Sequence, residues 1–204
     1  MKKSILILCV LLCVPCFAKK KDKCKMANYF LTFDGSTGYI TVPDDNAIDL
    51  GTSDFTFAFW MKANAPAAAS TVFGKIGAIT GYVVSIGSNY SGGYIDFNIY
   101  NKTSSASYSA TFPFFFDSQW SHHCFSVDRD GALVYYKNGS VVAATTETGA
   151  MFAATLDNFD DLLIGQSGRD SGFLNGSIDD FRLYKSALSQ EEVSAIYRGG
   201  AGSK

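Results

Sequence analysis

The sequence has few of the residues that helical proteins are rich in. Its 204 residues include three glutamates, two tryptophans and four prolines, against seventeen phenylalanines, eleven tyrosines and nineteen glycines. Because aromatic residues favour strands and glutamate favours helices, this composition predicts a turn-rich, all-β protein and not a helical bundle. With 47% apolar and 18% charged residues, the chain is neither disordered nor collagen-like, and one compact domain with a large core is expected.

The chain also lacks a concentration of positive charge. Its formal net charge is -2, and the basic residues gather on no predicted face. A protein that binds a phosphate backbone usually carries a basic patch or stripe. We therefore expect no nucleic-acid partner.

The first eighteen residues have the pattern of a secretory signal peptide. Lys2 and Lys3 precede an apolar run over 5–14, and small residues lead to Ala18. This pattern predicts cleavage after Ala18 and a secreted or cell-surface protein with no integral membrane segment after cleavage. The expected division is a signal peptide over 1–18, a basic tail over 19–28, one domain over 29–200 and a C-terminal tail over 201–204. An alternative start at Met26 would leave the protein with no export signal.

Cysteine is scarce once the leader is removed. Cleavage would leave Cys24 and Cys124, and an even pair in an exported protein permits one disulfide. The alternative is that both remain thiols. No Cys/His group with zinc-site spacing occurs in the mature chain.

Short alternating segments separated by Gly, Asn, Asp and Ser predict many strands. Asn138-Gly139 predicts a type I′ hairpin turn, since both central residues of that turn need positive φ. Ser189 and Glu192 form a capping box for one helix that ends at Gly199. The expected strands are 29–33, 38–42, 55–62, 71–75, 82–86, 94–100, 106–112, 121–128, 132–137, 140–146, 161–165 and 177–184.

Six segments occur in the order of a known family. They are LTFDGSTGYITVP at 31–43, FTFAFWMKA at 55–63, WSHHCFSVDRDG at 120–131, VYYKNGSVVAAT at 134–145, LLIGQSG at 162–168 and FLNGSIDDFRLYKSALSQEEVSAIY at 173–197. Together they resemble the concanavalin A-like, laminin G-like jelly roll family, whose relatives include the pentraxins. The resemblance implies an all-β sandwich of two antiparallel sheets with one concave face, loops at the rims and a short C-terminal helix.

The carboxylates predict no hydrolytic centre. Glucanase-like members of the family carry Glu-x-Asp-x-x-Glu on one strand, which places two carboxylates about 5 Å apart. Here the glutamates lie only at 147, 191 and 192, and the pairs Asp160-Asp161 and Asp179-Asp180 would point to opposite faces of a strand. His122 and His123 would diverge in the same way, and no Gly-x-Ser-x-Gly motif accompanies them. We therefore expect a protein that is not an enzyme.

The resemblance also implies a calcium ion as a structural cofactor. Many laminin G-like domains hold one calcium with acids near the first and last strands, which correspond to Asp34 and Asp179 here. In pentraxin-like relatives the stretch at LLIGQSGRDSG carries ligands, and Gln166 and Asp170 are the matching positions. Calcium prefers such oxygen ligands. The alternative for Asp179 is that it accepts backbone hydrogen bonds.

Tyrosines beside asparagines suggest a carbohydrate site, because sugar C–H faces stack on aromatic rings and sugar hydroxyls need polar partners. The candidates are Tyr90, Tyr94, Tyr100 and Tyr135. Four glycosylation sequons occur, at Asn89, Asn101, Asn138 and Asn175. We expect a secreted binding domain for a glycan or glycoprotein surface; the alternative is a protein-binding adhesion or structural module of a cell surface or virion.

Overall fold

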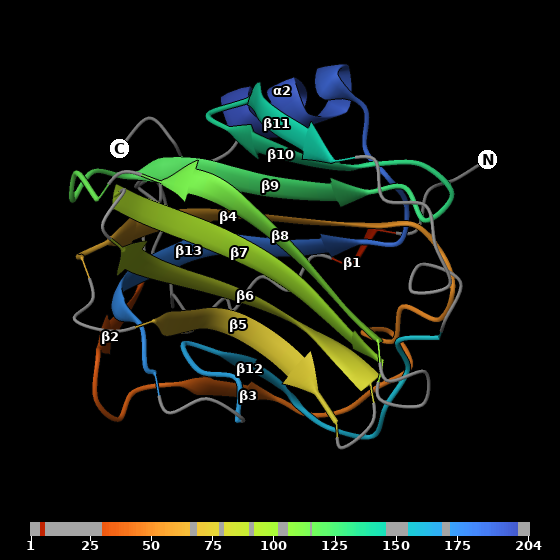
Figure 1. The fold of residues 1–204 in the computed structure, drawn as a ribbon, viewed down its shortest axis with the longest axis horizontal. Coiled ribbons are helices and arrows are strands. Elements are labelled where there is room, and N and C mark those ends of the chain that lie inside the picture. Colours follow the sequence, from red (N-terminus) through yellow and green to blue (C-terminus); the bar gives the residue numbers. More distant parts are fainter. Residues whose placement is uncertain are drawn as a thin grey trace, which may run out of the picture.

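The protein folds as two antiparallel sheets packed face to face (Figure 1). The computed structural model describes residues 5–6, 30–65, 69–77, 80–89, 92–101, 106–114, 116–145, 155–168 and 172–199. In these residues the first sheet has seven strands in the order β1-β13-β4-β9-β10-β11, with β2 also pairing with β13. The second has six, in the order β3-β12-β5-β6-β7-β8. The expected jelly roll is confirmed.

The strands agree with the alternating pattern of the sequence. The first sheet contains β1 (Ile5–Leu6), β2 (Leu31–Asp34), β4 (Phe55–Ala63), β9 (Ser121–Val127), β10 (Leu133–Lys137), β11 (Ser140–Thr145) and β13 (Asn175–Tyr184). The second contains β3 (Ile40–Val42), β5 (Ser70–Ile76), β6 (Thr80–Asn89), β7 (Gly92–Asn101), β8 (Ala106–Phe114) and β12 (Leu162–Ile164). Only β1, which pairs with the end of β13, has no counterpart among the predicted strands.

The space between the sheets is filled mainly by aromatic rings. Phe55, Phe57 and Phe59 alternate along β4 and are completely buried, because successive residues of a strand point to opposite faces. The ring of Phe57 lies 4.8 Å from that of Phe73 on the second sheet. Burying one such side chain contributes about 1.5 to 3 kcal/mol, so the aromatic core stabilises the sandwich.

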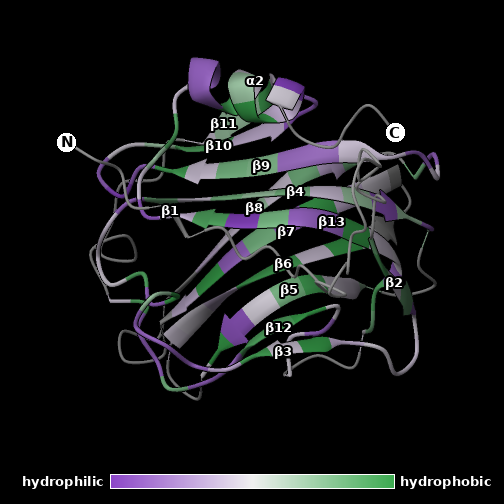
Figure 2. Cartoon of the chain, turned by 180° about the vertical axis from the view of Figure 1, so that it is seen from behind, coloured by the Kyte–Doolittle hydropathy of each residue, from purple (hydrophilic) through white to green (hydrophobic). Residues whose placement is uncertain are grey.

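A single described helix, α2 (Gln190–Gly199), covers part of the outer face of the first sheet (Figures 1 and 2). It begins with the predicted capping box: Ser189 N donates to Glu192 Oε2 at 3.0 Å and Glu192 N to Ser189 Oγ at 3.3 Å. Val193 of the helix packs against a small apolar cluster that includes Ala58 and Cys124. The predicted end at Gly199 is confirmed.

Burial under α2 explains the state of Cys124. This cysteine is a free thiol with no exposed surface, and burial raises its pKa above the usual value. The predicted partner, Cys24, lies outside the described residues, so the disulfide stays a prediction. Cys124 points to the outer face of β9, in the apolar cluster that Val193 of the helix completes.

The β10–β11 hairpin turns as the sequence predicted. Asn138 and Gly139 have φ values of 52° and 75°, the left-handed values that a type I′ turn needs. A Cβ on Gly139 would lie 2.9 Å from Tyr197 Cδ1 of α2. Gly139 thus serves both the turn and the close approach of the helix.

Candidate functional site

The outer face of the second sheet carries a polar and aromatic row along β7. Ile95, Phe97 and Ile99 point into the core and are completely buried. The alternate residues point outward and are half-buried; they are Tyr94, Asp96, Asn98 and Tyr100. This row is the candidate site, and it faces away from the sheet that α2 covers (Figure 1).

The ring of Tyr94 lies across the neighbouring strand β6. Tyr94 pairs with Gly87, and a Cβ built on Gly87 would lie only 2.3 Å from both Tyr94 Cζ and its hydroxyl. The missing side chain therefore makes room for the phenol end of the ring. On the other side, Tyr94 pairs with Pro113 of β8, which is exposed. The ring lies along the sheet surface, as a stacking platform would.

Asp96 is the unusual residue of the row. Its Oδ1 is buried and has no hydrogen-bond partner in the described part of the chain. Burial raises the pKa of Asp96 above its usual value, and a hydrogen bond with the Thr111 side chain opposes that rise. A buried acceptor without a donor costs stability. The residue as a whole is half-buried, so the rest of the carboxylate is accessible from the outer face of β7.

The structure separates the four predicted tyrosines. Tyr94 and Tyr100 share the outer face of β7, about 20 Å apart along the strand, and Tyr90 lies outside the described residues. Tyr135 was wrongly predicted as a ligand contact: it is completely buried, and its hydroxyl hydrogen-bonds His123 Nδ1 at 2.8 Å. Asp96 was not among the residues predicted from the sequence, where its only signal was its even spacing with the tyrosines.

The two histidines point to opposite faces, as predicted. His123 faces the core, where its Nε2 hydrogen-bonds Ser121 Oγ at 2.8 Å. His122 faces outward between Trp60 and Tyr197, with ring centroids 5.5 and 6.0 Å away. Burial lowers the pKa of both imidazoles, so both are neutral at pH 7.

Asp34 and Asp179 do not meet, so the prediction that they share a calcium ion is wrong. Asp34 pairs with Asn175 on β13, and Asp179 lies four residues farther along, which corresponds to about 13 Å. Asp179 Oδ1 accepts a hydrogen bond from Asp180 N at 2.8 Å, as the alternative expected.

The carboxylate of Asp34 is occupied by its own turn. It accepts hydrogen bonds from the backbone N–H groups of Thr37, Ser36 and Gly38 at 2.9, 2.8 and 3.1 Å, and from the Thr37 hydroxyl at 2.9 Å. These donors hold the pKa of Asp34 well below its usual range. Gln166 is half-buried after β12 and Asp170 lies outside the described residues, so their calcium role stays a prediction. No group of three His, Cys, Asp or Glu suited to a metal occurs in the described ranges.

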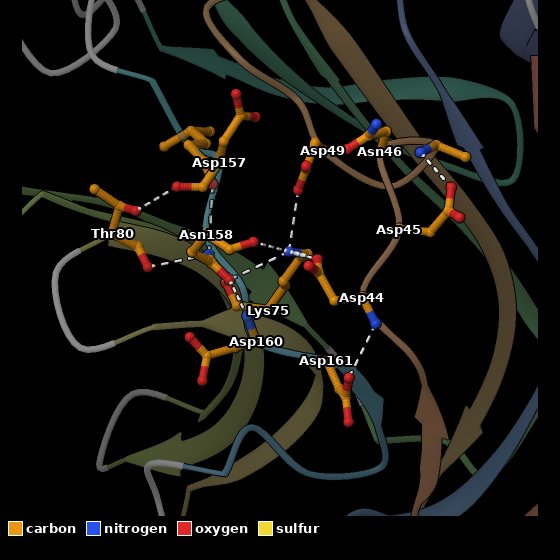
Figure 3. A network of polar contacts seen from close by, with 12 residues as sticks. Asp44, Asp45, Asn46, Asp49, Lys75, Thr80, Asp157, Asn158, Asp160 and Asp161 are labelled. Carbon is orange, nitrogen blue, oxygen red and sulfur yellow. Dashed lines mark hydrogen bonds and ion pairs between the residues drawn. The ribbon is translucent and has the colours of Figure 1, made fainter.

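At one rim of the sandwich a buried lysine holds several oxygens together (Figure 3). Lys75 has no exposed surface. Its Nζ contacts Asp44 Oδ1 at 2.7 Å, Asp49 Oδ1 at 3.1 Å, and the carbonyl and Oδ1 of Asn158 at 2.7 and 3.2 Å. An ammonium group thus supplies the positive charge at this acidic rim.

The loop after residue 155 is pinned by this network. Asp161 Oδ1 accepts a hydrogen bond from Asp44 N at 2.9 Å, and Asp157 Oδ1 accepts one from Gly51 N at 2.6 Å. Phe159 lies between these anchors and is 96% exposed. A large apolar ring is therefore presented to solvent on a well-held loop.

The two adjacent aspartates of β13 bind different partners. Asp180 lies at a bulge with φ 51° and binds Arg182 through two contacts of 2.8 and 2.6 Å, whereas Asp179 accepts the backbone bond described above.

In the described part of the chain no helix is long and apolar enough to cross a bilayer.

Comparison with solved structures identifies the same fold in toxin binding domains. The binding domain of Paraclostridial mosquitocidal protein 1 is 15% identical with a TM-score of 0.67, covering 81% of this chain and 42% of that one. The botulinum neurotoxin serotype G binding domain is 18% identical with a TM-score of 0.66 and the same coverages. The serotype D ligand binding domain in complex with N-acetylneuraminic acid is 18% identical with a TM-score of 0.65, covering 81% and 41%.

This chain therefore spans less than half of these solved chains, and the likeness concerns the fold. No curated protein matches the sequence. A model of the family described as the concanavalin A-like lectin/glucanases superfamily matches residues 34–194, which is well over half of the chain. Together with the two-sheet jelly roll, this match shows that the chain belongs to the concanavalin A-like lectin/glucanase superfamily.

Proposed function

We propose that this chain is a secreted, non-catalytic domain that binds a glycan on the outer face of its second sheet. The observation that carries the proposal is the half-buried carboxylate of Asp96 beside the surface ring of Tyr94 on the outer face of β7. One solved neighbour, botulinum neurotoxin type C, depends for cell entry on two ganglioside molecules, and another holds N-acetylneuraminic acid. These neighbours support the ligand class.

The geometry suggests how a sugar would bind. Its C–H face would stack on Tyr94, which contributes about 1 kcal/mol, and one hydroxyl would donate to the accessible part of the Asp96 carboxylate. A hydrogen bond to a charged acceptor contributes about 1.5 to 3 kcal/mol. After the cost of association, two such contacts give weak binding for each sugar. Millimolar or weaker dissociation constants are expected.

The distribution of acids supports a binding role over hydrolysis. Asp96 is the single acidic residue in the described strands of the second sheet. Glycosidases of the usual kind need two carboxylates that flank the scissile bond. A lone carboxylate can accept a sugar hydroxyl but lacks the partner that this chemistry requires.

Asp96→Asn tests the proposal through two opposite effects. At pH 7 the variant removes a charged group that folding disfavours, so its melting temperature should rise, while glycan affinity should fall about tenfold because the acceptor is weakened. Glycan-array screening followed by calorimetry measures the affinity. Tyr94→Ala should also lose binding, and Tyr39→Ala, at an exposed ring outside this row, is the matched control. Full affinity in both Asp96→Asn and Tyr94→Ala would refute the site.

A second candidate function, docking of a protein, is favoured by Phe159. Its ring is 96% exposed, and interface hot spots are commonly large aromatic side chains held in place by their surroundings. Phe159→Ser should abolish binding to an identified protein partner without lowering the melting temperature. If glycan binding fails and Phe159→Ser loses a partner that sugars do not displace, this second function replaces the first.

The export that the proposal includes has its own test. Amino-terminal sequencing of the protein recovered from the medium or cell surface should begin at Lys19. A mature chain that still carries residues 1–18 would contradict cleavage.

A further inference from the structure

We propose that a pocket on the outer face of the first sheet binds the carboxylate group of an acidic sugar. The pocket lies where β2, β13 and β4 run side by side. Its polar lining comes from Thr32, Lys62, Asn64, Asn175 and Ser177. This site is separate from β7, which belongs to the other sheet.

A chain of hydrogen bonds gives the pocket an excess of donors. Ser118 Oγ donates to Asn64 Oδ1 at 3.2 Å, and Asn64 Nδ2 donates to Asn175 Oδ1 at 3.0 Å. Both acceptor oxygens of the two amides are therefore used within the protein. The Nδ2 of Asn175, with two N–H donors, has no acceptor in the described part of the chain and is available to a ligand.

The charge of the pocket also favours a negatively charged ligand. Lys62 is exposed, no described carboxylate forms an ion pair with it, and none of the lining residues is acidic. Thr32 and Ser177 share one hydrogen bond of 3.1 Å between their hydroxyls, so one hydroxyl hydrogen is left to donate. A cation with neutral N–H and O–H donors matches a carboxylate.

Two aromatic rings beside the pocket favour a sugar over a simple anion. Phe30 precedes β2 and Trp120 precedes β9, and their ring centroids are 5.4 Å apart in an edge-to-face arrangement. Since β13 and β4 lie between β2 and β9, the pair spans the face next to Lys62. Phe30 is 50% exposed. Its ring offers an apolar surface to the C–H groups of a sugar whose carboxylate lies on Lys62.

Titration of the protein with glucuronate tests the proposal, and glucose, which lacks the carboxylate, is the uncharged control. The full chain is produced in bacteria, because Asn175-Gly176-Ser177 is a glycosylation sequon. We expect glucuronate to shift the side-chain amide resonance of Asn175 and the backbone resonance of Lys62 in two-dimensional NMR spectra, and glucose to shift neither. No shift up to about 50 mM glucuronate, or equal shifts with glucose, would overturn the proposal.

Substitutions distinguish binding at this pocket from a general effect of the protein's charge. Lys62→Gln and Asn175→Asp should each weaken glucuronate binding about fivefold or more, since the first removes the cation and the second replaces a donor with a negative charge. Lys185→Gln is the control: it removes the same charge near the far end of β13, about 26 Å away, and should bind normally. Equal loss in this control would overturn the assignment.

Two further measurements distinguish the possible outcomes. Sodium sulfate should bind less tightly than glucuronate, and equal binding would overturn the sugar part of the inference. Tyr94→Ala should leave glucuronate binding at the pocket unchanged. The pocket can therefore fail while the β7 site stands, or stand while the β7 site fails.

Discussion

Protonation of His122 should destabilise the fold in mild acid. The imidazole is 1% exposed and lies between Trp60 and Tyr197, at the C-terminal part of α2. Burial lowers the pKa of His122 to about 4, against an opposing influence from Asp180 and a reinforcing one from Arg182. An unfolded histidine has a pKa of about 6.5.

The sign and size follow from proton linkage. Between pH 6.5 and 4 the unfolded chain binds a proton at this position and the folded chain does not, so the free energy of unfolding falls as the pH falls. A gap of about 2.5 pH units at 1.36 kcal/mol each gives about 3 kcal/mol, of which most is lost by pH 4. This is a large part of the 5 to 15 kcal/mol that is usual for a whole domain.

Urea denaturation of the wild type and His122→Phe at pH 7 and pH 4.5 measures the effect. Phenylalanine keeps a flat ring against Trp60 and Tyr197 but cannot be protonated. The wild type should lose about 2 to 3 kcal/mol more than the variant between the two pH values. His123 and the carboxylates contribute alike to both proteins. Equal losses, or an NMR-titrated pKa above 6 for His122 in the folded protein, would refute the reasoning.

Three other predictions concern the rim at Lys75, the outer surface of the second sheet and the cysteine beneath α2. Lys75→Met should lower the free energy of unfolding by about 3 kcal/mol or more, because it leaves paired carboxylates without their cation; a loss below 1 kcal/mol in urea denaturation would contradict this. Gly87→Ala should displace the Tyr94 ring and weaken glycan binding while the melting temperature stays nearly constant, and unchanged affinity in calorimetry would show that the ring is not needed. Cys124 should react with a thiol reagent only at the rate of unfolding, as measured by absorbance; rapid labelling in native buffer would show that α2 does not seal it.

Local sequence patterns were sufficient for the elements themselves. The alternation of Phe55, Phe57 and Phe59 predicted a strand with one buried face, and the structure buries all three completely. Asn138-Gly139 predicted its turn and Ser189 with Glu192 predicted the helix start, since each of these signals acts between residues a few positions apart.

The candidate site could be predicted only in part. Alternation alone could place Tyr94 and Tyr100 on one face of β7, but it could not distinguish an outer face from the core. Tyr135 also lies on an alternating strand, and it points inward because of how β10 pairs with β9. Asp96 became a candidate only when its packed neighbours left one oxygen buried and unpartnered.

By itself, the sequence determined the fold class, the strands and the capped helix, because these depend on the side-chain period and on short-range hydrogen bonds. Tertiary structure alone decided that α2 seals Cys124, that Lys75 holds the acidic rim, and that Asp34 and Asp179 lie far apart. These features depend on the register between distant strands and on which face each loop or helix covers. The register between strands and the covering of each sheet face are set by the packing of the whole sandwich, which no short segment encodes.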